Sequence, residues 1–114
     1  MKVPNAHAAV IEDSKLREYL LSLAHPVGRY KARFFRGLGY TREDAGQLAA
    51  DLRGILGNEV DETIETEFGI KYVVPGQLVA PGGSATEIVT IWIILIGEEA
   101  PTLVTAYPGG SDED

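Results

Sequence analysis

Hydrophobic residues follow two different periods along this chain, and the period changes near residue 59. In the first half they recur three or four residues apart, which is the spacing of one face of an α-helix. In the second half they alternate with polar residues or form β-branched runs, which is typical of strands. The order of the two patterns predicts helices first and a sheet afterwards.

Three segments of the first half predict helices. Asp13 is a favourable N-cap for the first of them, and Pro26 suits the first turn of the second. Thr41 and Asp44 have the spacing of a capping box, which opens the third. The expected helices run from Asp13 to before His25, from Pro26 to Gly37, and from Thr41 to Gly57.

Four segments of the second half predict strands. The first alternates acidic side chains along one face, which suits an edge strand protected by charge. Pro75 and Gly76 are expected to bend the second, because proline cannot donate to a central ladder. The third has apolar residues on both faces, as in a central strand covered on one side by helices. The expected strands are residues 59–67, 70–79, 86–96 and 103–107, with a turn at 81–84.

Short links between successive strands favour an antiparallel meander. We therefore expect an α+β fold, in which three N-terminal helices pack on one face of a four-stranded antiparallel meander sheet. The 114 residues suffice for one hydrophobic core. Residues 1–108 are expected to form a single domain, and residues 109–114 a flexible acidic tail.

Composition and charge narrow the setting. The chain has no cysteine, which excludes disulfides and thiolate metal sites and suits the cytoplasm. Its longest apolar stretch, residues 88–96, is too short to span a bilayer, and its amino-terminal residues lack the apolar run of a signal peptide. We expect a soluble, cytoplasmic protein that makes no membrane contact.

The net charge of −7 argues against a general nucleic-acid binder. The charge is uneven, however, because no acidic residue lies between Tyr19 and Arg42. Five basic residues fall in that stretch: Arg29, Lys31, Arg33, Arg36 and Arg42. One local surface is therefore expected to be basic.

Candidate chemistry gathers in the same stretch. The imidazole of His25 titrates near neutral pH, and it sits at a predicted helix start, where backbone amides also hold anions. Lys31 lies among apolar positions of its helix. Either its stem covers the core while the ammonium reaches water, or the ammonium stabilises an anionic transition state in a cleft. With two histidines and no cysteine, we expect no metal site and no cofactor.

Two further pairs carry polar groups on the predicted strands. Thr90 and Trp92 share a face of the third strand, either as a hydrogen-bonded core pair or as part of a binding pocket. Thr105 and Tyr107 share a face of the last strand, where they either pack with their hydroxyls satisfied or contact a phosphate.

Several blocks, in this order and spacing, resemble an uncharacterised bacterial domain family, a domain of unknown function. They are Lys15-Leu16, Tyr19-Leu20-Leu21, His25-Pro26, Gly28, Lys31-Ala32, Phe34-Phe35, Leu38-Gly39-Tyr40, Gly69, Lys71-Tyr72, Pro81-Gly82-Gly83, Trp92-Ile93-Ile94 and Leu103-Val104-Thr105-Ala106-Tyr107-Pro108. Members of that family look like stand-alone proteins and C-terminal modules of bacterial polymorphic toxins. More distantly, the chain resembles barnase/EndoU/colicin-type ribonuclease toxins.

The resemblance implies a metal-independent hydrolase that cleaves RNA phosphodiesters. By position it implies a catalytic set and a substrate-binding set. The catalytic set is His25 as general acid or base, Lys31, Thr105 and Tyr107; the substrate-binding set is Arg29, Arg33, Thr90 and Trp92. Where the family often carries arginine, this chain has Val89 and Thr102, so a degenerate, inactive member stays an alternative.

Two rival functions remain open from the sequence. One is a non-enzymatic interaction or immunity-like module, with a protein partner or a second copy of the chain, which suits the overall acidity. The other is a small-molecule site around Trp92. The ribonuclease hypothesis requires His25, Lys31 and either Thr105 or Tyr107 to converge on one open basic cleft, whereas an interaction module requires an exposed apolar patch or a symmetric interface.

Overall fold

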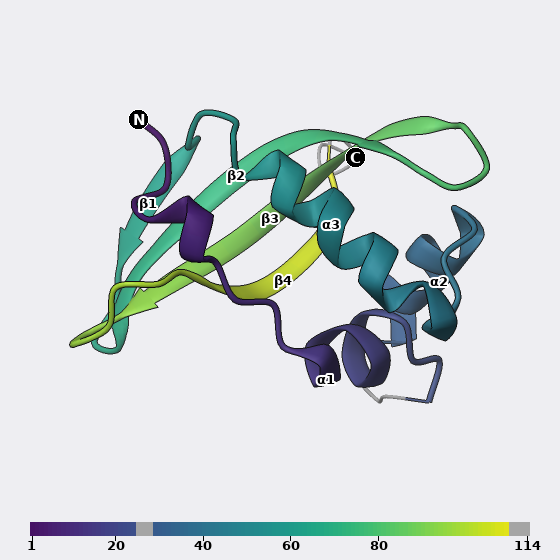
Figure 1. Ribbon diagram of the computed structural model, residues 1–114, viewed down its shortest axis with the longest axis horizontal. Coiled ribbons are helices and arrows are strands. Elements are labelled where there is room, and N and C mark those ends of the chain that lie inside the picture. The colour runs from purple at the N-terminus through teal and green to yellow at the C-terminus, as the bar shows by residue number, and fades with distance from the viewer. Residues whose placement is uncertain (25–28, 110–114) are drawn as a thin grey trace.

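The computed structural model describes residues 1–24 and 29–109 and contains one four-stranded antiparallel sheet (Figure 1). The strand order is β1-β2-β3-β4, so each strand pairs with its neighbours in the sequence. The predicted α+β class, the meander and the edge position of the acidic strand are confirmed. The strands are β1 (Glu62–Glu65), β2 (Gly69–Val79), β3 (Ala85–Leu95) and β4 (Thr102–Pro108).

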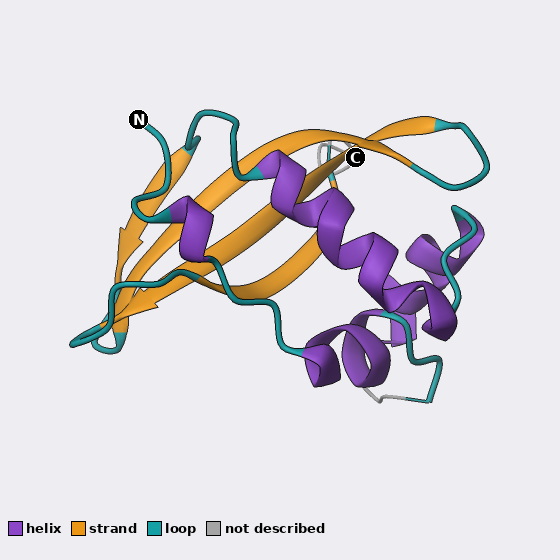
Figure 2. Cartoon of the chain, in the orientation of Figure 1, coloured by secondary structure: helices purple, strands orange, loops and turns teal. Residues whose placement is uncertain are grey.

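Helical segments precede the sheet and are shorter than predicted (Figure 2). They are η1 (Ala6–Ala8), α1 (Asp13–Lys15), η2 (Leu16–Leu20), α2 (Arg29–Gly37), η3 (Arg42–Asp44) and α3 (Ala45–Ile55). The prediction of three regular packed helices is therefore correct only in part. The start of the second helix at Pro26 lies outside the described residues. No helix within the described ranges is long and apolar enough to cross a membrane.

The first predicted helix is the one that differs most. It is a single α turn followed by the π turn η2, in which the amide of Leu21 donates to the carbonyl of Leu16 at 2.8 Å. A π turn inserts one extra residue and shifts the side chains that follow it around the helix axis. Here it buries Leu16 and Leu20 while Tyr19 stays partly exposed.

The predicted capping box is present and leads into α3. The amide of Thr41 donates to Asp44 Oδ2 at 2.8 Å, and the Thr41 side chain bonds back to the first turn. In Figure 1, α3 lies across the sheet, and it packs on β2. Gly76 suits this close approach, because a Cβ atom there would lie 2.4 Å from Asn58 Nδ2 and 3.0 Å from Ile55 Cγ2.

Strand β4 is irregular where it pairs with β3. Ile91 pairs with Thr105 while Trp92 pairs with Leu103, so Val104 has no partner and forms a β-bulge. A bulge breaks the alternation of side chains and re-aims those beside it. Both α1 and α2 contact β4, so the bulge brings Thr105 within reach of the helical half of the chain.

Candidate functional site

The phenol of Tyr19 lies between two lysine side chains. Lys31 Nζ donates a hydrogen bond to Tyr19 Oη at 3.2 Å and lies 5.5 Å from the centroid of the Tyr19 ring. Lys15 Nζ lies 5.0 Å from the same centroid. All three side chains are half-buried. The π turn, α1 and α2 thus place two ammonium groups against one half-buried tyrosine.

Strand β4 adds a hydroxyl to this cluster. The Oγ1 atom of Thr105 is buried and makes no hydrogen bond of full geometry within the described part of the chain. It is nevertheless close enough to Tyr19 for its side chain to lower the pKa of the phenol. A buried hydroxyl without a well-formed bond is uncommon in proteins.

Opposing effects act on the pKa of Tyr19. Burial raises it, because the charged form is poorly solvated. The hydrogen bond from Lys31 and the nearby hydroxyl of Thr105, followed by the positive charges of Lys31 and Lys15, outweigh burial. The pKa of Tyr19 therefore lies below the ordinary tyrosine value, and the surroundings favour the phenolate. We call Tyr19, Lys15, Lys31 and Thr105 the Tyr19 cluster.

The positive charge of the cluster is not neutralised by carboxylates. Across residues 1–24 and 29–109, the ion pairs join the amino terminus to Glu59 and Arg17 to Asp13. Neither pair involves Lys15 or Lys31. Helix α2 itself carries no acidic residue. The two ammonium groups of the cluster therefore form no ion pair within the described residues, although the whole chain is acidic.

A second aromatic side chain on α2 carries two arginines. Tyr30 is 60% exposed, and the guanidinium carbons of Arg29 and Arg33 lie 5.0 Å and 5.6 Å from its ring centroid. Arg29 Nη2 also donates to Tyr30 Oη at 3.1 Å. The ring and the two guanidinium groups thus form an exposed cationic and aromatic surface on α2. Arg36 is not available in this way, because its Nε donates to the Leu21 carbonyl at 3.1 Å.

Of the predicted catalytic residues, Lys31 and Thr105 meet at Tyr19, and His25 lies outside the described residues. Tyr107 lines a cavity of about 260 Å³, beside two acidic residues. Those carboxylates repel a phosphate, so we leave Tyr107 out of the proposed site. The other lining residues of that cavity are Asp61, Glu62, Val73, Val89, Pro108 and Gly109.

The two predicted substrate contacts on β3 are sealed in the core. Thr90 and Trp92 are both 0% exposed. The indole Nε1 of Trp92 donates to Thr90 Oγ1 at 2.8 Å, and the Thr90 hydroxyl donates to the Val74 carbonyl at 2.8 Å. This is the hydrogen-bonded core pair that the sequence also allowed. A substrate cannot reach either side chain, so neither belongs to the proposed site.

Tyr19 and Tyr30 were not singled out from the sequence as functional residues. The sequence carried a signal for both. Lys15 precedes Tyr19 by one helical turn, and Arg33 follows Tyr30 by three residues. Tyr19 borders the acid-free stretch, and Tyr30 and Arg33 lie within it. Cation and aromatic pairs at these spacings share a helix face. They are equally common on plain solvated helices, so the spacing alone did not separate a site from a surface.

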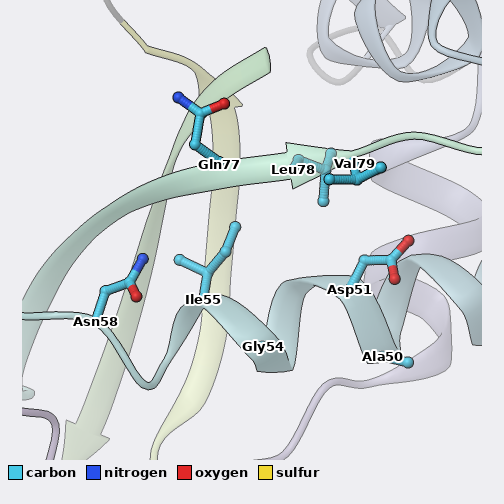
Figure 3. Close-up of a pocket in the computed structure, with 8 residues that line it drawn as sticks. All are labelled: Ala50, Asp51, Gly54, Ile55, Asn58, Gln77, Leu78 and Val79. Carbon is cyan, nitrogen blue, oxygen red and sulfur yellow. The ribbon is translucent and has the colours of Figure 1, made fainter. Parts of the chain in front are cut away.

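A groove runs between α3 and the end of β2 at residues 77–79 (Figure 3). Its volume is about 520 Å³. Strand β1 pairs with β2 only as far as Val73, so residues 75–79 have no partner strand on that edge within the described ranges. The lining residues are Ala50, Asp51, Gly54, Ile55, Asn58, Gln77, Leu78 and Val79.

Comparisons with known proteins agree with this architecture. The family described as "Domain of unknown function (DUF6883)" matches residues 2–110. No curated protein matches the chain. One similar solved structure belongs to a "Contact-dependent growth inhibition toxin - immunity protein complex from Klebsiella pneumoniae 342", with a TM-score of 0.71, 14% sequence identity, and coverage of 91% of this chain and 96% of that chain. At this identity the likeness establishes the fold alone.

Proposed function

Since the chain belongs to the DUF6883 family, we propose a function for it from the site that its fold builds: a metal-independent ribonuclease domain of the toxin type, which cleaves RNA phosphodiester bonds. The Tyr19 cluster carries this proposal, because it combines a phenol with two ammonium groups that form no ion pair within the described residues. The similar fold in a toxin and immunity protein complex supports a toxin-related role.

Each group has a role that follows from its charge. The ammonium of Lys31 stabilises the negative charge that develops on the phosphoryl oxygens in the transition state. The hydroxyl of Thr105 lies against the phenol of Tyr19 and helps to lower its pKa. Tyr30 stacks on a base beside the cleaved bond, and Arg29 and Arg33 bind the neighbouring phosphates. His25 stays a general acid or base predicted from the sequence.

Replacing Lys31 with methionine is expected to lower the rate of RNA cleavage by about 10²-fold, the effect of removing one donor to a transition-state anion. The rate is measured on a synthetic oligoribonucleotide and on tRNA, with a metal chelator present. The chelator is expected to leave wild-type cleavage unchanged. Lys71→Met is the matched control, because Lys71 is also half-buried but lies on β2. Intact RNA with the wild-type protein, or equal rates for Lys31→Met and wild type, would contradict the proposal.

A second candidate is a self-associating interaction module. The edge of β2 at residues 75–79 favours it, because that edge has no partner strand within the described ranges. The amide of Asp61 donates to the Val73 carbonyl, so the backbone groups of Val73 face that edge. Backbone direction alternates along a strand, so Gln77 and Val79 present their amides and carbonyls there too. The Pro75 carbonyl already accepts from Asn58 Nδ2 at 3.1 Å. An antiparallel copy of the same edge offers matching donors and acceptors about a twofold axis.

Replacing Gln77 with proline is expected to weaken this dimer at least about tenfold, because it removes one edge amide from each of the two copies, each worth about 1 kcal/mol. Sedimentation velocity on wild type and variant measures the change. The net charge of −7 opposes self-association, so added salt is expected to strengthen the dimer. A monomeric wild-type protein at all salt concentrations would rule the dimer out without affecting the ribonuclease proposal.

A further inference from the structure

We propose that Tyr19 is the catalytic base that removes the proton from the attacking ribose 2′-hydroxyl, an inference that rests on the ribonuclease function proposed above. Its phenol oxygen lies 3.2 Å from Lys31 Nζ. A phosphate bound by that ammonium would place the neighbouring ribose within reach of the phenol. The base and the electrostatic stabiliser thus belong to one site built from η2 and α2.

Groups that face Tyr19 from the elements packed around it include two ammonium groups and one hydroxyl. They are Lys15 from α1, Lys31 from α2 and the hydroxyl of Thr105 from β4. Burial opposes ionisation of the phenol, but the hydrogen bonds and the two positive charges exceed that effect and lower its pKa. A tyrosine in such surroundings ionises more readily than one in water, which favours its use as a base.

Tyr40 provides a contrast within the same chain. Its hydroxyl donates to Asp51 Oδ2 at 2.5 Å. Burial, the bond to Asp51 and the charges of Asp51 and Asp44 all raise the pKa of Tyr40. Tyr40 therefore stays protonated as a structural donor, whereas the lysines around Tyr19 favour the opposite protonation state. The difference lies in the charge of the neighbours, since both phenols are at least partly buried.

The proposed step conserves atoms and charge. The Tyr19 phenolate accepts the 2′ proton as O2′ forms its bond to phosphorus. The bond from phosphorus to O5′ then breaks, and O5′ leaves with the electron pair and takes a proton from water. The Tyr19 phenol returns its proton to the resulting hydroxide. The products are a 2′,3′-cyclic phosphate and a 5′-hydroxyl, so a substrate with deoxyribose at the cleaved position is expected to resist cleavage.

The pH profile of cleavage tests the role of Tyr19. A base acts only when deprotonated, so the wild-type rate is expected to rise with pH and to level off above the pKa of Tyr19. The midpoint should lie below about 10, the ordinary tyrosine value. Tyr19→Phe keeps the ring on which the two lysines lie, so the fold and RNA binding are expected to survive. The variant should lose the rising limb and about 10²-fold of the plateau rate.

Phenolate absorbance supplies a readout that needs no RNA. The difference between the titrations of wild type and Tyr19→Phe isolates one phenol among five tyrosines. A pKa below about 10 supports the inference, and a value at or above it overturns the inference. If Tyr19→Phe cleaves RNA with the wild-type rate and pH profile, Tyr19 is not the base and the ribonuclease function stands. If the wild-type protein leaves RNA intact, the function itself fails, and the inference fails with it.

Discussion

Replacing Trp92 with alanine is expected to lower the free energy of unfolding by about 3–5 kcal/mol, the range for truncating a fully buried aromatic residue. Trp92 is the largest of the fully buried side chains and lies on the central strand β3. Its removal leaves a cavity between the sheet and the helices. The Thr90 oxygen also loses the hydrogen bond that the Trp92 indole N–H donates to it. Chemical denaturation followed by circular dichroism measures the change.

Two milder substitutions separate packing from hydrogen bonding at this position. Trp92→Phe retains most of the apolar contact and loses only the indole N–H, so it is expected to cost much less than alanine. Thr90→Val keeps the shape but leaves the buried Trp92 N–H without its acceptor, a loss of about 1–3 kcal/mol. If Trp92→Ala unfolded at the same denaturant concentration as the wild type, the residue could not be a centre of the core.

The sheet was predictable from the sequence because its signals are local. The acidic alternation of residues 59–67 identified the edge strand, and the apolar run of 86–96 identified a strand buried on one face. The capping box of Thr41 and Asp44 is likewise a short-range pattern. Each of these depends on residues a few positions apart, so the chain alone contained the information.

The site was harder to predict because its contacts are not local. A π turn and an α turn share nearly the same hydrophobic spacing, so the bond from Leu21 to Leu16 left no mark in the sequence. The bulge at Val104 depends on pairing across two strands. Lys31 and Thr105 were singled out from the sequence as candidates for a shared site, but Tyr19, which contacts both, became visible only once η2, α2 and β4 were packed together.

The Tyr19 cluster lies outside the core, so we expect substitutions in it to leave the core intact. The core pair of Thr90 and Trp92 satisfies its own polar groups inside the sheet. Lys15, Lys31 and Tyr19, by contrast, lie at half-buried positions, where a change of charge does not leave a cavity. Substitutions in the Tyr19 cluster are therefore expected to change activity more than stability, whereas those in the core do the reverse.

Replacing Gly69 with alanine is expected to destabilise the chain by about 3 kcal/mol or more, at the upper end of the range for overpacking. A Cβ atom at Gly69 would lie 2.2 Å from the Ile94 carbonyl oxygen and 2.8 Å from Leu95 Cα. Both atoms belong to the backbone of β3, which cannot turn aside as a flexible side chain does. Either β2 separates from β3 at the Gly69 end, or the turn formed with Thr66 opens. Either change breaks hydrogen bonds.

The matched control is Gly46→Ala, which should have the opposite sign. Gly46 lies in α3, and a Cβ atom there has nothing within 4 Å. Alanine stabilises an exposed helix position relative to glycine by about 0.5–1 kcal/mol. Denaturation midpoints should therefore fall for Gly69→Ala and rise for Gly46→Ala. If both variants shifted in the same direction, the loss at residue 69 would reflect glycine content rather than the close approach of β2 and β3.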